Sequence, residues 1–360
     1  MINVLGLLPI TGNGGIASWT KKFLETYPND DYNIIPVNVS PDDKTISREN
    51  KFYRYISGLK ALIRIYKECY KVIQENDITI MHTTTSGSIG TLRDYIINRL
   101  CHKYKIKTIM HCRYGCIPED FVKNGFWGWL LRKTMHEYDQ VWVLDSRSEA
   151  ALKKDPLMTN KVYLTPNSIE VPSECDLSPR SYKRIAFVGN LIPTKGLYEI
   201  VEACTKIDVR LDIVGPGTPE VVNHIKSIAG DKLNNSIYIH GRLPNEQAVS
   251  FMCDVDIIAL PTYYSSEGFP ISILEAMSRG KMVISCPRAA IKDMLTAVDG
   301  TQCGILVREK SVDDIVDAIK WCQENTEEAD KMCKKAYEKV YTCYRTDVIY
   351  KLYKSLYDKL

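Results

Sequence analysis

Twelve short apolar runs divide this chain into two series, and amphipathic stretches separate most of the runs. Alternation of this kind predicts parallel strands with helices on both faces of a sheet. The first series covers residues 2–8, 32–39, 78–82, 107–111, 140–144 and 161–165. The second covers residues 184–189, 209–215, 236–241, 255–261, 281–286 and 304–307. The sequence therefore predicts an α/β fold with two doubly wound, Rossmann-like parallel sheets.

The stretch between the two series, "PNSIEVPSECDLSPRSYK" at 166–183, is rich in Pro, Ser and charge, as a linker is. A chain of 360 residues is also long for a single core. We expect an N-terminal domain at 1–168 and a C-terminal domain at 169–341, with a helix at about 342–360 that packs back on the first domain. Ligands of such folds bind at strand carboxyl ends, here in a central cleft between the domains.

Composition is that of an ordinary soluble protein, with 45% hydrophobic and 25% charged residues. No run approaches 18 uninterrupted apolar residues, so we expect no membrane-spanning helix. We also expect no signal peptide, because Pro9 and Gly12 interrupt the first apolar run. The twelve cysteines include no C-x-x-C pair and are expected to be reduced cytoplasmic thiols.

Positive charge is concentrated in residues 44–113, which carry fourteen Lys/Arg against five Asp/Glu. Within this stretch, residues 51–75 have helical periodicity, and we expect one face to enter the core. The apolar residues of that face are Tyr55, Leu59, Leu62, Ile63, Tyr66 and Tyr70. The excess charge predicts an anionic partner or membrane surface, whereas no recognition motif favours nucleic acid.

A glycine-rich turn, "PITGNGGIASW" at 9–19, fits the G-x-G-x-x-G/A pattern of dinucleotide-binding folds. Those folds need an acidic residue at the end of the second strand, where this chain has Asn38. No Lys-Ser/Thr follows the glycines, which excludes a Walker phosphate loop. The turn therefore predicts close approach of a ligand to Gly14 and Gly15, with free N–H groups at the next helix start.

The strongest chemical pattern is "LPTYYSSEGFPISILEAMSRGKMVIS" at 260–285. A buried strand is followed by Glu267, and Pro270 fits the first position of a helix. The N–H groups of Ile271 and Ser272 would then be free to bind phosphate, and Glu275 lies about one turn further along. The two glutamates would flank an anion at the helix start.

These residues resemble a known family. E-G-F-P-x4-E resembles the E-x7-E motif of the family-four retaining glycosyltransferases, which have the GT-B architecture. "FVGNLIPTKG" at 187–196 resembles their phosphate segment, with Lys195 as its lysine, and "TIMHCRYG" resembles their sugar-proximal histidine strand. Two positions depart from the pattern: Asn190 replaces an arginine, and Ser168 replaces a linker glycine. Arg242 and Arg113 are candidates to replace the missing cation.

The resemblance implies transfer of a sugar from a nucleotide diphosphate donor, UDP- or GDP-linked, with retention. Lys195, the helix start at Ile271 and Ser272, and Gly14–Gly15 would stabilise the departing diphosphate. Glu275 would bind the ribose, Glu267 the sugar hydroxyls, and His111 the sugar. His111 also fits a core histidine, and the remaining histidines are expected to be structural. The donor-binding set implied by the family comprises Gly14, Gly15, Asn190, Lys195, Arg242, Glu267, Phe269, Ile271, Ser272 and Glu275.

Other functions stay open. Paired carboxylates also suit a glycoside hydrolase, although that reaction gives Lys195 no role. A nucleotide-sugar epimerase of the same architecture, or a binding protein that has lost transfer, are alternatives. "DVD" at 254–256 matches the D-x-D metal motif, but it precedes a buried strand, and we expect neither a metal nor another cofactor. The basic stretch favours a polyprenyl diphosphate-linked glycan as acceptor, in capsule or surface polysaccharide assembly at the inner membrane face.

Overall fold

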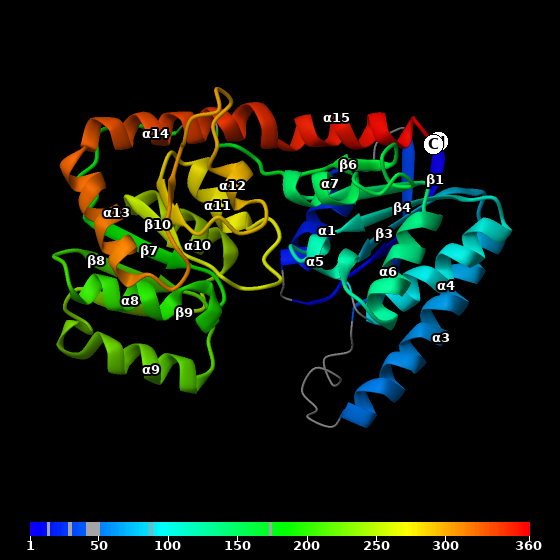
Figure 1. Ribbon diagram of the computed structural model, residues 1–360, viewed down its shortest axis with the longest axis horizontal. Coiled ribbons are helices and arrows are strands. Elements are labelled where there is room, and N and C mark those ends of the chain that lie inside the picture. The colour runs from blue at the N-terminus through cyan, green and yellow to red at the C-terminus, as the bar shows by residue number, and fades with distance from the viewer. Residues whose placement is uncertain (13–14, 28–30, 41–50, 86, 88, 173–174) are drawn as a thin grey trace. The chain divides into compact units, whose positions relative to one another are not determined.

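The chain folds into two compact units, seen in a computed structural model that describes residues 1–12, 15–27, 31–40, 51–85, 87, 89–172 and 175–360 (Figure 1). Unit 1 comprises Met1–Pro166 together with Tyr350–Leu360. Unit 2 comprises Asn167–Ile349. The sequence placed the division at 168/169 and assigned the C-terminal helix to the first domain.

Unit 1 is built on a parallel sheet of six strands in the order β2-β1-β3-β4-β5-β6. The strands are β1 (Ile2–Leu8), β2 (Tyr32–Asn38), β3 (Ile78–Thr85), β4 (Lys107–Cys112), β5 (Gln140–Val143) and β6 (Val162–Leu164). β3 runs past the predicted end at residue 82, because Thr83 and Thr85 continue the pairing with Met110 and Cys112 of β4. The direction of winding changes between β1 and β3.

Unit 2 has a second six-stranded parallel sheet, in the order β12-β11-β10-β7-β8-β9. Its strands are β7 (Arg184–Val188), β8 (Arg210–Val214), β9 (Ile237–Gly241), β10 (Ile257–Leu260), β11 (Met282–Ser285) and β12 (Ile305–Leu306). The chain first builds outward from β7 to β9 and then returns to β10 on the other side of β7. The predicted fold class, an α/β chain with two doubly wound parallel sheets, is confirmed.

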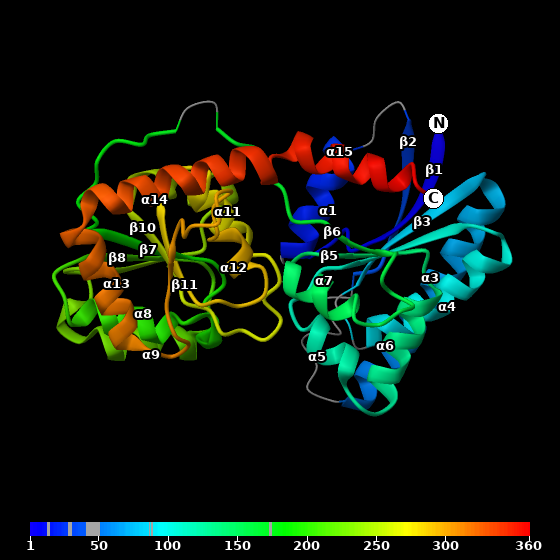
Figure 2. The same cartoon turned by 45° about the horizontal axis from the view of Figure 1, so that its top comes forward.

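Helices cover both faces of the unit 1 sheet (Figure 2). One layer contains α3 (Lys51–Glu75), α4 (Ile89–Lys103) and α6 (Phe126–Glu137), and the other contains α1 (Gly15–Thr26) and α15 (Thr346–Tyr357). The shorter helices α5 (Ile117–Val122) and α7 (Ser146–Leu152) follow β4 and β5. Among the described residues, no helix has the length and apolarity needed to cross a membrane.

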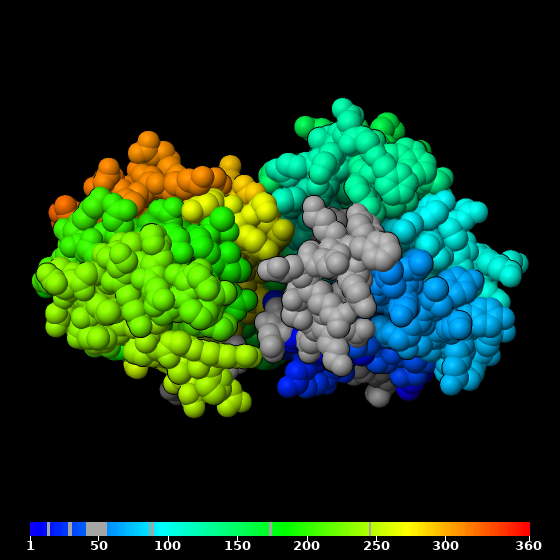
Figure 3. Space-filling model, turned by 90° about the horizontal axis from the view of Figure 1, so that it is seen from below, coloured from blue at the N-terminus to red at the C-terminus, as the bar shows by residue number. Residues whose placement is uncertain are grey.

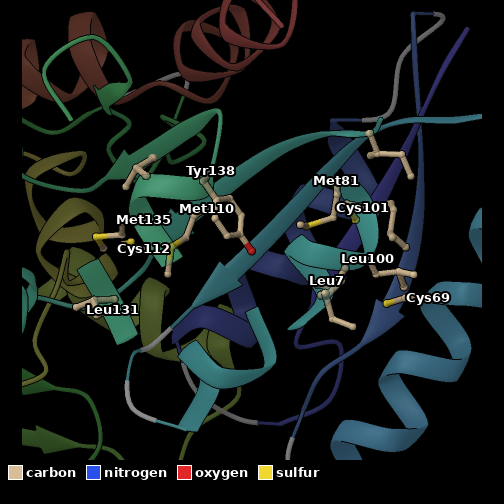
Figure 4. Packing of buried hydrophobic residues seen from close by; sticks show 14 of the residues in the cluster. Leu7, Cys69, Met81, Leu100, Cys101, Met110, Cys112, Leu131, Met135 and Tyr138 are labelled. Atoms are coloured by element: carbon tan, nitrogen blue, oxygen red, sulfur yellow. The ribbon is translucent and has the colours of Figure 1, made fainter. Parts of the chain in front are cut away.

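Strand alternation assigns the unit 1 side chains to two packed layers. Met81, Met110, Cys112 and Val141 point toward the α3, α4 and α6 layer and form its core (Figure 4). Their strand neighbours point the other way and pack against α1 and α15, as His82 and Trp142 do on Tyr357.

The core face of α3 differs from the predicted one. Ile65, Cys69 and Ile73 enter the core, whereas Leu59, Ile63, Tyr66 and Tyr70 are exposed and Leu62 is half-buried. The side chain of Tyr55 lies outside the described residues. The prediction was wrong because α3 carries two apolar stripes, and periodicity alone does not say which one the sheet covers.

The helices of unit 2 also lie on both faces of its sheet (Figure 1). α8 (Leu197–Thr205), α9 (Pro219–Ala229) and α13 (Val312–Glu324) pack side by side. α11 (Ile271–Met277) and α14 (Thr326–Lys339) pack together and against β11. α10 (Asn245–Phe251), α12 (Ile291–Met294) and a π-helical turn, Val340–Tyr344, complete the unit.

Candidate active site

The carboxyl ends of β7 and β10 form the point in unit 2 at which the order of the strands reverses. Ligands of open α/β sheets bind at such points. The loop after β7 carries Lys195, and the loop after β10 carries Glu267. Their side chains meet: Lys195 Nζ lies 3.1 Å from Glu267 Oε2, and both side chains are largely buried, at 17% and 10% exposed.

Backbone contacts hold these two loops together. Gly196 follows Lys195 with φ +75°, and a Cβ there would lie 2.2 Å from the carbonyl oxygen of Pro261 in the second loop. Tyr263 N donates to the Thr194 carbonyl at 2.9 Å. The Tyr263 hydroxyl donates to Glu199 Oε1 on α8 at 3.0 Å. Only glycine permits this close approach without strain, so the position of Lys195 depends on Gly196.

The carboxylate of Glu267 meets Lys195 as an ion pair. Its Oε2 receives no hydrogen bond of good geometry from the described residues. The ammonium of Lys195 also lies 6.0 Å from the centre of the Tyr264 ring. Because an ammonium has three N–H donors, Lys195 can pair with Glu267 and still donate to a bound anion.

Helix α11 begins next to Glu267, one residue later than predicted. Pro270 is its N-cap rather than its first helical residue, because ψ of 117° keeps Pro270 extended. The Pro270 carbonyl accepts from Ile273 N at 3.2 Å. The N–H groups of Ile271 and Ser272 precede this first bond and have no acceptor within the helix. They lie where the sequence placed them, at the start of the helix.

Phe269 packs inside unit 2. Its ring meets Tyr344 edge-on at 5.3 Å, and its side chain is 5% exposed. Its carbonyl accepts from Asn167 Nδ2 at 2.8 Å. These contacts fix the segment between Glu267 and α11. Donor binding by Phe269 stays a prediction.

The other predicted donor-binding residues of unit 2 differ in how exposed their side chains are. Glu275 is half-buried on α11, and its carbonyl accepts from Ser278 and Arg279. Asn190 is exposed directly after β7. Arg242 is exposed after β9, the edge strand, which lies two strands from β7. The structure thus brings Lys195 and Glu267 together, and donor binding by Arg242 stays a prediction.

His111 is fully buried within unit 1. Its Nδ1 lies 3.2 Å from His82 Nε2, and its Nε2 lies 3.1 Å from an Nη of Arg113. His82 in turn meets the Tyr357 hydroxyl of α15 at 2.5 Å. These contacts match the core-histidine alternative, and contact with the sugar stays a prediction. Gly15 is the exposed first residue of α1, and Gly14 lies outside the described residues.

Burial sets the protonation of this network. It lowers the pKa of His82 to about 3 and holds the pKa of His111 well below its usual value, with the charge of Arg113 acting in the same direction. Arg113 is itself buried, its guanidinium 3.8 Å over the Trp19 ring, and burial lowers its pKa to about 10. Both histidines are therefore neutral at pH 7. Sequence reasoning treated His82 as structural but gave no signal that it pairs with His111.

Asn38 and Ser40 have a role that the sequence did not reveal. Asn38 Oδ1 accepts from Ile10 N at 3.1 Å, and Ser40 Oγ accepts from Thr11 N at 3.0 Å. These bonds tie the turn after β1 to the end of β2. The position that carries an acid in dinucleotide folds is therefore used for structure.

Asp256 of the D-x-D match is likewise a structural residue. Its Oδ2 accepts from Lys183 N at 3.0 Å and Arg184 N at 3.2 Å, which fixes the start of β7. Within the part of the chain that the structure describes, no group of three His, Cys, Asp or Glu side chains is arranged to hold a metal ion.

Comparison with known proteins shows which family unit 2 resembles. Residues 176–339 match the family model of the glycosyl transferases group 1. The matched segment lies within unit 2 and covers just under half of the chain. It is 26% identical over 283 residues to an uncharacterized glycosyltransferase of Methanocaldococcus jannaschii, covering 73% of this chain and 69% of the relative. It is also 26% identical over 183 residues to a putative colanic acid biosynthesis glycosyltransferase of Escherichia coli, covering 48% of this chain and 44% of the relative.

Solved structures share the fold over the whole chain. Sucrose-phosphate synthase from Thermosynechococcus elongatus superposes with a TM-score of 0.78 at 13% identity, covering 100% of this chain and 99% of its own. A lipopolysaccharide outer core galactosyltransferase gives 0.73 at 14% identity, with both chains fully covered. The chain therefore has the GT-B fold of these glycosyltransferases, and the predicted family resemblance is confirmed.

Proposed function

We propose that this glycosyltransferase moves a hexose, with retention, from a nucleotide diphosphate sugar to a hydroxyl of a glycan acceptor. The Lys195–Glu267 pair at the strand-order reversal of unit 2, next to the start of α11, carries the proposal. A structure from Anabaena in the same fold is described as a complex with UDP, which supports a UDP-sugar as the first donor to test, with GDP-sugars second.

In the proposed reaction, the anomeric C–O bond breaks and negative charge develops on the leaving diphosphate. Lys195 and the N–H groups of Ile271 and Ser272 stabilise that charge, and fixed donors of this kind lower the barrier. Glu267 accepts hydrogen bonds from the sugar hydroxyls, and Glu275 accepts them from the ribose diol. The reaction needs no metal, because the ammonium and the helix start supply the positive charge.

We further propose a lipid-linked glycan as the acceptor, in capsule or other surface polysaccharide assembly. A relative from Campylobacter jejuni, 27% identical over 49% of this chain and 44% of its own, is named for transfer to a diphospho-undecaprenol-linked sugar. The positive excess of residues 44–113 supports such an acceptor at an anionic surface. The enzyme would then work in the cytoplasm, peripherally attached to the inner membrane face.

The test is a screen of UDP-, GDP-, ADP- and TDP-sugars for nucleotide release, followed by NMR of the transferred anomer. We expect release from one donor class and the same anomeric configuration in donor and product. An inverted product contradicts the retaining mechanism. Epimerisation of the free nucleotide sugar without any acceptor identifies the epimerase alternative, and binding without turnover identifies a protein that has lost transfer.

A further inference from the structure

An apolar stripe runs along the exposed side of α3. Its members are all exposed, with Leu59 at 59%, and comprise Ile56, Leu59, Ile63, Tyr66 and Tyr70. At 100° per residue they fall within an arc of about 80° and extend about 21 Å along the helix. The core face, at Ile65 and Cys69, points elsewhere. Isolated apolar residues are normal on a surface, but a continuous stripe of this length marks an interaction site.

Positive charge borders this stripe. Lys60, Lys67 and Lys71 are exposed along one edge of it. α3 carries six Lys/Arg and two Glu. Both glutamates have a cationic partner, Glu68 with Arg64 at 3.2 Å and Glu75 with Lys71 at 3.8 Å. The surface beside the stripe is therefore suited to an anionic partner.

A second apolar group lies at the corner between α5 and α6. It exposes Val122, Phe126, Trp127 and Trp129, with Trp129 at 51%. The corner is held firmly: Arg132 donates to the carbonyls of Phe121 and Lys123, at 2.6 and 3.1 Å. A Cβ at Gly128 would lie 1.9 Å from the Lys123 carbonyl oxygen. The fold thus fixes a turn that presents three aromatic rings to the outside.

Both groups belong to one helical layer of unit 1, because α4 packs against α3 on one side and α6 on the other. Figure 3 shows the side from which α3, α4 and the α5–α6 corner all reach the surface. Exposed Trp, Phe and Tyr rings combined with lysines are typical of proteins that enter the interfacial region of a bilayer.

We propose that this layer is a membrane-docking surface. The α3 stripe and the α5–α6 corner enter the interface of an anionic bilayer, and Lys60, Lys67 and Lys71 bind its headgroups. The proposal rests on the proposed function for its setting and adds the surface that meets the lipid. Charge and composition favour lipid over a second copy of the chain, because like-charged lysine edges would repel one another in a symmetric pair.

The first experiment is cosedimentation of the full chain with phosphatidylcholine vesicles, with and without phosphatidylglycerol, at low and physiological salt. We expect binding to the anionic vesicles that weakens with salt. Vesicles of brominated lipid should also quench Trp127 and Trp129, since Trp19 and Trp142 are buried in the core and Trp321 is half-buried on α13 of unit 2. Failure to bind anionic vesicles at low salt, or binding without quenching, overturns the proposal.

Variants then locate the surface. Leu59→Ser with Ile63→Ser, and separately Trp127→Ser with Trp129→Ser, should each weaken the partition coefficient at least about tenfold. The control is Leu157→Ser, a 65% exposed leucine of unit 1 outside these helices. Changing Lys60, Lys67 and Lys71 to Gln should weaken binding and reduce its salt dependence. The matched control changes three exposed lysines of unit 2 to Gln: Lys226, Lys232 and Lys331.

Surface variants that bind like their controls contradict the assignment. A wild-type dimer that Leu59→Ser with Ile63→Ser converts to monomer, measured by sedimentation without lipid, assigns the surface to a second copy instead. Nucleotide release from the donor, measured without vesicles, should be unchanged in all surface variants. Because vesicle binding needs neither donor nor acceptor, failure of the docking surface and failure of the proposed reaction give different results.

Discussion

The ammonium of Lys195 lies 3.1 Å from a carboxylate oxygen of Glu267, and the two residues come from the loops of adjacent strands β7 and β10. Removing either partner of a largely buried pair leaves the other charge uncompensated. Substitutions in this pair therefore report on both the architecture of the site and its chemistry, and binding must be measured beside turnover.

Lys195→Ala should lower kcat/KM by about tenfold to a hundredfold or more. A charge-assisted hydrogen bond contributes roughly 1.5–3 kcal/mol, and the effect grows if the bond strengthens as the diphosphate leaves. Lys206→Ala is the control, a lysine of unit 2 whose side chain is 45% exposed beside Glu202. Steady-state kinetics and circular dichroism check the result. Activity within twofold of the wild type removes Lys195 from the site.

Glu267→Gln and Glu275→Gln should affect different steps. Glu275 is proposed to bind the ribose, which is present in substrate and product, so its substitution should weaken nucleotide binding. Glu267 is proposed to face the reacting sugar, so its substitution should mainly slow turnover. Calorimetry with free UDP and GDP separates the two. If both variants bind nucleotide as tightly as the wild type, the ribose assignment is wrong.

Gly196→Ala should destabilise unit 2 and impair catalysis together. An L-residue at φ +75° costs about 1 kcal/mol, and its Cβ would meet the Pro261 carbonyl at 2.2 Å, so we expect a loss of about 2 kcal/mol or more. Gly300→Ala is the matched control, since Gly300 has φ +81° but no atom within 4 Å of its Cβ. Urea unfolding measures both variants. If Gly196→Ala and Gly300→Ala lower the free energy of unfolding equally, the close approach of Gly196 to Pro261 is not important for stability.

The sequence predicted the strands well, and it placed Lys195 and Glu267 in loops that follow two of them; donor binding by both residues stays a prediction. Buried parallel strands are continuous apolar runs, and the Gly-Phe-Pro segment indicates a helix start. The contact between Lys195 and Glu267 required knowing that β10 lies next to β7, which the order of strands along the chain does not state. The family resemblance assigned both residues to one donor site, but neither the resemblance nor periodicity predicted their contact.

Two features of unit 1 that the sequence did not reveal have physical causes. The α3 stripe was placed in the core because apolar spacing identifies a face without identifying what covers it. The His82–His111 contact arises from strands β3 and β4 pairing in a register that places His82 opposite Ile109 and Thr84 opposite His111. A shift of one residue between the two strands would place His82 and His111 on opposite faces of the sheet. Single-sequence patterns do not fix such a register.

The buried histidines should make stability depend on pH in a defined range. Because the folded-state pKa values of His82 and His111 are lowered, the unfolded chain binds more protons below its ordinary histidine pKa of about 6.5. Their contribution to stability is complete above that pH and is lost as the pH falls toward the folded-state pKa, about 3 for His82. At pH 5 the loss is about 2 kcal/mol for His82, and His111 acts in the same direction.

Urea unfolding at pH 7.5 and pH 5.0, followed by tryptophan fluorescence, measures this loss. The fluorescence of Trp142 reports on the surroundings of His82, because the centres of the two rings are 5.0 Å apart. Carboxylates with lowered pKa values, such as Asp314, lose their contribution only below about pH 4, so the chosen range isolates the histidines. His82→Gln should reduce the pH dependence, and His224→Gln, at an exposed histidine of α9, is the control variant. Equal stability at the two pH values would mean that His82 and His111 are accessible to protons in the folded enzyme, and the sugar-contact role of His111 would then regain support over the core role.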